Sequence, residues 1–306
     1  MTPLPPRVSL REVGPRDGLQ QEAPVPTEGK LALLQALAAA GLPRIEATSF
    51  VSPRAVPALA DAEQVAAALP GIAGPRWSAL VASPKGAARA VAAGLREVAH
   101  VVSAADGHSL ANAGRTTDDA VADVAETART LHDAGGVCEV IVAVAWDCPF
   151  DGPTPTARTA DVCARAVALG ADQLCLGDTI GTASPGRVWA LLDAVRAAVG
   201  PGVPLGIHLH DTRGMGAANA LAAVQAGVTM LDASVGGLGG CPFAPGASGN
   251  LATEELVYLL EDAGVATGVD LDALLAAARL AGDLLGKPLR SGLLQAGGRS
   301  VPRGRG

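Results

Sequence analysis

The segment that decides the interpretation of this chain is Val203-Pro204-Leu205-Gly206-Ile207-His208-Leu209-His210-Asp211-Thr212-Arg213-Gly214. An apolar run typical of a buried strand ends in two histidines, and a polar turn then leads into a helical pattern. Side chains two apart on a strand project from the same face, so His208 and His210 can both reach one metal ion. The alternative is a pair of polar residues that only close the strand.

Along the rest of the chain, short apolar or β-branched runs alternate with Ala- and Leu-rich stretches of helical period. We expect strands at residues 7–13, 44–48, 77–81, 97–102, 137–144, 173–176, 204–210 and 229–234. We expect helices at residues 27–40, 58–68, 85–93, 117–134, 156–169, 185–199, 215–226 and 253–263, with a further one at 271–285. Glycines suited to left-handed helix caps stand at Gly41, Gly94, Gly170 and Gly227.

Eight βα units predict an α/β fold, namely a (β/α)8 TIM barrel whose active site lies at the carboxyl ends of the strands. We expect one catalytic domain, with the barrel over about residues 7–264, a short additional C-terminal helix over about 270–286 and a tail over 287–306. A doubly wound open sheet is the alternative. It is disfavoured because the first βα loop, Gly14-Pro15-Arg16-Asp17-Gly18, lacks the glycine spacing that binds a dinucleotide.

Composition excludes several classes of partner. The 306 residues carry a formal net charge of −7, which argues against nucleic acid, and the short basic tail with Arg299, Arg303 and Arg305 does not change this. No uninterrupted apolar segment is long enough for a membrane span. The five cysteines show no CxxC spacing, so a disulfide framework is not expected, and the first residues do not resemble a signal peptide. A cytoplasmic location is therefore the expectation.

Polar residues cluster just after the predicted strands, where a barrel places its active site. Asp17, His208, His210 and Asn250 together offer carboxylate, imidazole and amide donors, which suit Mg²⁺ or Mn²⁺ better than a closed zinc site. Asn250 could instead cap the helix that begins a few residues later.

Arg16 can contact a carboxylate or an enolate oxygen, or it can form a salt bridge with Glu46 or Asp178, and the two roles are compatible. Glu46 and Asp178 can orient Arg16 and the metal ligands. The glycine-rich residues 236–246 predict a lid centred on the thiol of Cys241, or else a flexible loop with an incidental cysteine. We expect Cys138, Cys163 and Cys175 to be core residues.

The chain resembles the 3-hydroxy-3-methylglutaryl-CoA (HMG-CoA) lyase family, within a superfamily of metal-dependent lyases and Claisen-condensing barrels. The resemblance runs from about Arg7 to Gly286. It is strongest in VGPRDGLQQE (13–22), IEATSFVSP (45–53), LGDTIG (176–181), HLHDT (208–212) and GGLGGCPFAPGASGNLATE (236–254).

The resemblance implies that Asp17, His208, His210 and Asn250 bind a divalent cation, Mg²⁺ or Mn²⁺, and that Arg16 stabilises an enolate. It places Cys241 on a mobile catalytic loop and makes His208, Glu46 and Asp178 part of the catalytic set, with Glu254 in support. The implied substrate contacts are Arg16, Gln20, Lys85, Asn112 and Thr179. The general base stays open between Asp17 and a site histidine.

The implied reaction cleaves a 3-hydroxyacyl-CoA, HMG-CoA first among them, to acetyl-CoA and a β-keto acid such as acetoacetate. A homodimer and a place in leucine degradation and ketone-body formation are implied as well. The alternatives are a lyase for another 3-hydroxyacyl-CoA, a condensing synthase, disfavoured because the chain ends soon after the barrel, and a barrel that only binds.

The chain departs from the family pattern at three places that could touch the acyl chain or the CoA. These are Ser83-Pro84-Lys85, Ala105-Asp106-Gly107-His108 and Ala143-Val144-Ala145-Trp146-Asp147. His108 and Trp146 are therefore expected to reshape the acyl pocket. Lys85 and Arg89 are candidates for CoA phosphate contacts, or are solvated charges of their helix.

Overall fold

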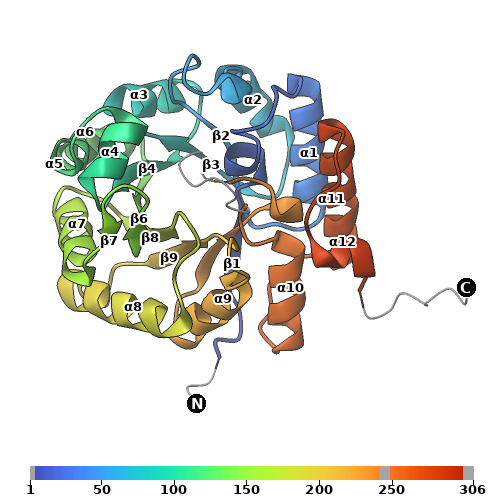
Figure 1. Ribbon diagram of the computed structural model, residues 1–306. Coiled ribbons are helices and arrows are strands. Elements are labelled where there is room, and N and C mark those ends of the chain that lie inside the picture. The colour runs from blue at the N-terminus through green and yellow to red at the C-terminus, as the bar shows by residue number, and fades with distance from the viewer. Residues whose placement is uncertain (1–3, 241–248, 299–306) are drawn as a thin grey trace, which may run out of the picture.

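In the computed structural model, which describes residues 4–240 and 249–298, eight parallel strands close into a barrel surrounded by helices (Figure 1). Their order around the barrel is β1, β10, β9, β8, β5, β4, β3, β2, so each pairs with the next barrel strand along the chain and β10 returns to β1. The predicted (β/α)8 barrel is confirmed. The strands are β1 (Ser9–Glu12), β2 (Arg44–Ser49), β3 (Arg76–Val81), β4 (Glu97–Ser103), β5 (Val137–Ala143), β8 (Gln173–Asp178), β9 (Leu205–Leu209) and β10 (Met230–Ala233).

Helices form the outer ring, and Ala, Val and Leu fill the layer between them and the sheet. The predicted cap glycines Gly41, Gly94, Gly170 and Gly227 all have positive φ, which a residue with a Cβ adopts only at a cost. The helices are α1 (Thr27–Ala39), α2 (Ala62–Ala68), α3 (Pro84–Ala92), α4 (Asp106–Ala113), α5 (Thr117–Ala122), α6 (Val124–Asp133), α7 (Thr156–Ala168), α8 (Pro185–Val199), α9 (Gly216–Gln225), α10 (Thr253–Asp262), α11 (Leu271–Leu285) and α12 (Gly292–Ala296).

The predicted helix at residues 117–134 is wrong as one unit, because it breaks at Asp123 into α5 and α6. The interruption is one residue long: the amide of Asp123 still donates to the carbonyl of Asp119 at 3.3 Å, and its carboxylate pairs with Arg115. Helix α4 was not predicted, since its Asp, Gly, His, Ser and Asn residues have low helix propensity. A two-stranded hairpin, β6 (Asp147–Cys148) with β7 (Gly152–Pro153), also lies outside the prediction.

The predicted C-terminal helix is present as α11, which packs beside α1 (Figure 1). The predicted tail is in part structured, because residues 292–296 form α12 and the amide of Gly292 donates to Glu255 at 2.5 Å. The basic residues Arg299, Arg303 and Arg305 lie outside the described residues. Cys138, Cys163 and Cys175 are buried free thiols, as predicted. Within the described ranges, no helix combines the length and apolar character that a bilayer crossing needs.

Candidate active site

A cavity of about 890 Å³ opens at the carboxyl ends of the barrel strands. Its walls include residues that end or directly follow β1, β2, β3, β5, β8 and β9. Eight side chains that the sequence placed in a site contribute to these walls, namely Arg16, Asp17, Gln20, Lys85, Asn112, Thr179, His208 and His210. Residues from distant parts of the chain therefore meet at one opening, as parallel strands of a closed barrel require.

Asp17, His208 and His210 converge in this cavity, and all three are buried. The Nε2 atoms of the two histidines lie 3.2 Å apart, and they lie 3.9 and 3.8 Å from Oδ2 of Asp17. The point equidistant from these three atoms is about 2.1 Å from each, which is the distance at which Mg²⁺ binds its ligands. The three atoms thus surround a space into which a small divalent cation fits.

The amide of Asn250 lies beside these three side chains. Its Nδ2 donates to Oδ2 of Asp17 at 2.6 Å and to the carbonyl of Leu238 at 2.9 Å. Its Oδ1 is buried without a partner among the described residues, a costly arrangement for an acceptor unless a cation or donor meets it. Helix α10 begins at Thr253 with Ala252 as N-cap, so the capping alternative for Asn250 is wrong. Carboxylate, imidazole and amide donors with one orphaned oxygen fit a divalent cation.

Arg16 and Asp17 lie in η1 (Gly14–Gly18), a single π-helical turn that directly follows β1. The guanidinium of Arg16 donates to Oδ1 of Asp17 and to Oε2 of Glu46 on β2, so the predicted ion pair with Glu46 is present. Gln20 donates to the same Oδ1 of Asp17 at 3.0 Å. Both ends of the guanidinium are therefore fixed while Arg16 still lines the cavity.

The electrostatics keep Asp17 ionised. Burial alone raises the pKa of a carboxyl group, but Arg16, His210 and His208 outweigh burial and hold the pKa of Asp17 well below its ordinary value. An ionised carboxylate is the form that binds a cation, so Asp17 needs no proton release at neutral pH.

Asp178 does not contact Arg16, and the alternative ion pair between them is wrong. Its carboxylate accepts from the amides of Thr182 at 2.9 Å and Ala183 at 3.0 Å, which holds the loop after β8. Burial raises the pKa of Asp178, and these two amides offset only part of that effect. Asp178 therefore supports a loop of the cavity rather than its inner surface.

Thr179 lines the cavity, but its hydroxyl also has a structural contact. It accepts from the amide of Val144 at 2.8 Å. Val144 has a φ of 50°, which is rare for a β-branched residue and is sustained only by its surroundings. Thr179 therefore stabilises the strained end of β5.

Comparison with known proteins identifies the family. A family model described as HMGL-like matches residues 7–281. The chain belongs to this HMGL-like family.

Two curated members and one solved structure illustrate the family. The hydroxymethylglutaryl-CoA lyase YngG of Bacillus subtilis is 38% identical over 96% of this chain and 98% of its own length. The (R)-citramalyl-CoA lyase of Chloroflexus aurantiacus is 42% identical over 92% of both chains. The structure of an HMG-CoA lyase from Acinetobacter baumannii with coenzyme A and 3-methylmalate is 39% identical, covers 99% of each chain and superposes with a TM-score of 0.92.

Three charged residues around this HMGL-like site were missed from the sequence, namely Arg11, Glu12 and Asp232. Glu12 accepts from the amides of Gly14 at 2.6 Å and Val235 at 2.9 Å and from the hydroxyl of Thr253 at 2.6 Å. Burial raises the pKa of Glu12 to about 7. Charged residues inside predicted barrel strands were the available signal, because such positions are costly unless they are paired.

The two residues expected to reshape the acyl pocket differ in position. His108 lines the cavity, with Nδ1 2.8 Å from the hydroxyl of Ser103, and burial lowers its pKa to about 4, so it is neutral at pH 7. Trp146, which follows β5 in the chain, is buried, and its Nε1 donates to the carbonyl of Arg187 at 3.1 Å. It is not among the described cavity walls, so that expectation is wrong. Arg89 lines the cavity but pairs with Glu63 at 2.6 Å.

The remaining predicted residues belong to the loop after β10. Glu254, at the start of α10, accepts from the amide of Gly236 at 3.1 Å, and burial raises its pKa. It therefore supports the first part of this loop, while Cys241 lies outside the described residues. The described loop reaches the cavity at Gly240, whose carbonyl accepts from Gln21 at 2.6 Å.

Proposed function

We propose that this protein is a divalent-metal-dependent lyase that cleaves HMG-CoA to acetyl-CoA and acetoacetate. The observation that carries the proposal is the convergence of Asp17, His208 and His210 on one position beside Arg16, within a cavity of about 890 Å³. Membership of the HMGL-like family and full-length similarity to the Bacillus subtilis lyase support the same reaction.

The reaction breaks the bond between the second and third carbons of the substrate after the 3-hydroxyl loses its proton. Asp17, His208, His210 and Asn250 would hold Mg²⁺ or Mn²⁺, which when bound makes the 3-hydroxyl more acidic. Asp17 or a site histidine then accepts that proton.

Arg16 stabilises the charge that develops during cleavage. As the carbon–carbon bond breaks, negative charge collects on the thioester oxygen, and the guanidinium of Arg16 offers a fixed positive partner. The contacts of Arg16 with Glu46 and Asp17 hold it in place before the reaction begins. The acetyl-CoA enolate finally takes a proton at its second carbon, and Cys241 is the proposed donor.

Two observations favour a second candidate acyl group. His108 places a neutral imidazole in the cavity wall, and a relative of 42% identity is named (R)-citramalyl-CoA lyase. The acid arm of citramalyl-CoA is one methylene shorter than that of HMG-CoA. The runner-up function is therefore the same retro-Claisen reaction on a shorter 3-hydroxyacyl-CoA.

The test is release of acetyl-CoA from HMG-CoA and from citramalyl-CoA, each with Mg²⁺, with Mn²⁺ and with a chelator. Metal-dependent release from HMG-CoA at the higher kcat/KM supports the proposal, and a preference for citramalyl-CoA supports the runner-up. Asp17→Asn is the matched inactive control. Absence of release from both thioesters, together with thiol release from acetyl-CoA and a 2-oxo acid, would establish a condensing synthase instead. The implied homodimer is checked by light scattering on the purified protein.

A further inference from the structure

His208 has a second polar contact, on the edge of its ring away from Asp17 and His210. Its Nδ1 lies 3.1 Å from Oδ2 of Asp232 on β10. The sheet register pairs His208 with Asp232 and pairs Asp232 with Arg11 on β1. Three neighbouring strands thus place these side chains in one row across the seam where the barrel closes.

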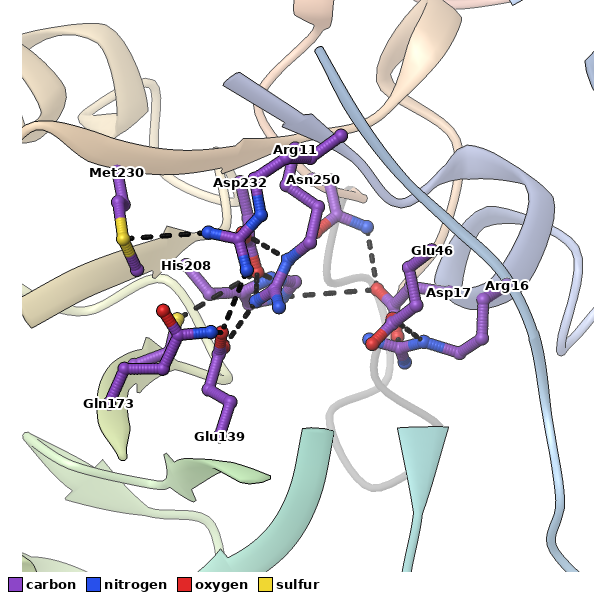
Figure 2. Close-up of polar contacts among 12 residues, drawn as sticks. Arg11, Arg16, Asp17, Glu46, Glu139, Gln173, His208, Met230, Asp232 and Asn250 are labelled. Carbon is purple, nitrogen blue, oxygen red and sulfur yellow. Dashed lines mark hydrogen bonds and ion pairs between the residues drawn. The ribbon is translucent and has the colours of Figure 1, made fainter. Parts of the chain in front are cut away.

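Arg11 binds the carboxylate of Asp232 with two parallel hydrogen bonds. Its Nε donates to Oδ1 and its Nη2 to Oδ2, both at 2.8 Å (Figure 2). The same Nη2 lies 2.7 Å from Oε1 of Glu139 on β5. Arg11 and Asp232 are 3% and 6% exposed, so water does not compete for these contacts. A bidentate pair of this kind fixes the plane of the carboxylate as well as its position.

The contact with Asp232 determines which nitrogen of His208 is free for a ligand. A carboxylate oxygen only accepts, so Nδ1 of His208 must carry the hydrogen. A neutral imidazole with Nδ1–H has its lone pair on Nε2, and Nε2 is the atom that faces His210 and Asp17. Figure 2 shows Asp232 between Arg11 and His208, and Asp17 beyond the imidazole.

We propose that Arg11 and Asp232 are a positioning pair for the metal centre, which holds His208 in the orientation and tautomer that present Nε2 to the cation. Neither residue reaches the described cavity wall, so the pair acts through His208 and not on the substrate. The inference rests on the proposed metal-dependent function. It concerns affinity for the cation and not the chemistry of cleavage.

Asp232→Asn tests the pair. In this variant the side-chain carbonyl would turn to the N–H groups of Arg11 and the side-chain amide to Nδ1 of His208, which imposes the opposite tautomer. We expect the Kd for Mn²⁺, measured as free Mn²⁺ by electron paramagnetic resonance, to rise about 10- to 100-fold. Glu97→Gln is the matched control. Glu97, the first residue of β4, pairs with the buried Arg44 and the exposed Arg76 and, within the described part of the chain, forms no ion pair with His208.

The outcomes separate the inference from the function on which it rests. A wild-type protein that binds no Mn²⁺ overturns the proposed function. A wild-type protein that binds Mn²⁺, with Asp232→Asn binding it as tightly as Glu97→Gln does, overturns the positioning pair alone.

A second variant and a direct observation keep the inference testable if Asp232→Asn does not fold. Arg11→Lys keeps the charge but not the paired hydrogen bonds, and we expect a smaller, several-fold loss of Mn²⁺ affinity. Long-range ¹H–¹⁵N spectra of the metal-free wild-type protein report the tautomer of His208 directly. A signal from Nε2–H instead of Nδ1–H at His208 would refute the inference without any variant.

Discussion

Gly239→Ala should disrupt the metal centre although Gly239 is not itself a ligand. Gly239 has a φ of 107°, and a Cβ added there would lie 2.5 Å from Nδ2 of Asn250 and 3.3 Å from Oδ2 of Asp17. The first distance is too short for any contact, so the amide of Asn250 has to move. When this amide moves, its 2.6 Å hydrogen bond to Asp17 is broken, and Oδ1 of Asn250, which has no partner among the described residues, is withdrawn from the proposed metal centre.

The magnitude follows from these two effects. Alanine at a φ of this kind costs about 1–3 kcal/mol, and losing a hydrogen bond to a buried carboxylate costs about 1.5–3 kcal/mol. We therefore expect urea denaturation without metal to show about 2.5–6 kcal/mol of destabilisation. Because one ligand is lost and a second is less constrained, the Kd for Mn²⁺ should rise at least about tenfold.

Gly264→Ala is the matched control for this prediction. Gly264 also has a positive φ, 79°, but its added Cβ would meet no atom within 4 Å. It should lose the stability that the backbone strain costs and keep its Mn²⁺ affinity. Equal Mn²⁺ affinity in the two variants would contradict the view that Asn250 belongs to the centre.

Three further predictions concern single side chains. Arg16→Lys should lower kcat about 10²- to 10³-fold, because a lysine cannot contact Glu46 and Asp17 and still face the substrate. Steady-state release of acetyl-CoA measures kcat, and an unchanged kcat would contradict the role of Arg16. Lys85→Ala should raise the KM for the acyl-CoA and leave kcat unchanged, and an unchanged KM at low salt would make Lys85 a solvated helix charge. Burial lowers the pKa of His100 from 6.5 to about 4, so between these values the unfolded chain binds a proton at His100 that the folded protein does not. His100 should therefore contribute a loss of roughly 2 kcal/mol of stability as pH decreases from 6.5 to 4.5. Urea denaturation of the wild type and of His100→Asn at the two pH values measures this contribution as the difference between the two proteins, and equal pH dependence would contradict it.

Much of the fold could be predicted because local signals agreed with the final architecture. Apolar runs, helical periods and cap glycines such as Gly41 and Gly227 set the βα repeat, and these depend only on neighbouring residues. The interruption at Asp123 could not be predicted, because it is a single residue that keeps helical backbone angles, with a φ of −64° and a ψ of −19°, and leaves no mark in the local sequence pattern. Helix α4 was missed since its stability comes from contacts such as Asp106 with the amide of Thr117, not from propensity.

The site was predictable where function depends on position along a strand, and less so where it depends on pairing across strands. His208 and His210 follow from a spacing of two residues. Asn250 could be interpreted either as a helix cap or as a ligand, and the start of α10 at Thr253 excludes the first of these while the second stays a prediction. The contact of Arg11 with Asp232 spans 221 residues, and no local pattern indicates which inward-facing charges meet when the barrel closes.

The closing seam of the barrel links metal binding to folding. Asp17 follows β1, the histidines belong to the end of β9, and Asn250 follows β10, so the ligand set exists only when β1 pairs with β10. A cation that binds the folded protein alone stabilises it by about 2.7 kcal/mol at a hundred times its Kd. Arg11 and Asp232 lie on the same two strands, so the contact that orients His208 also joins the barrel ends. Sequence similarity proposes the ligands, but the pairing of first and last strands brings them into one site.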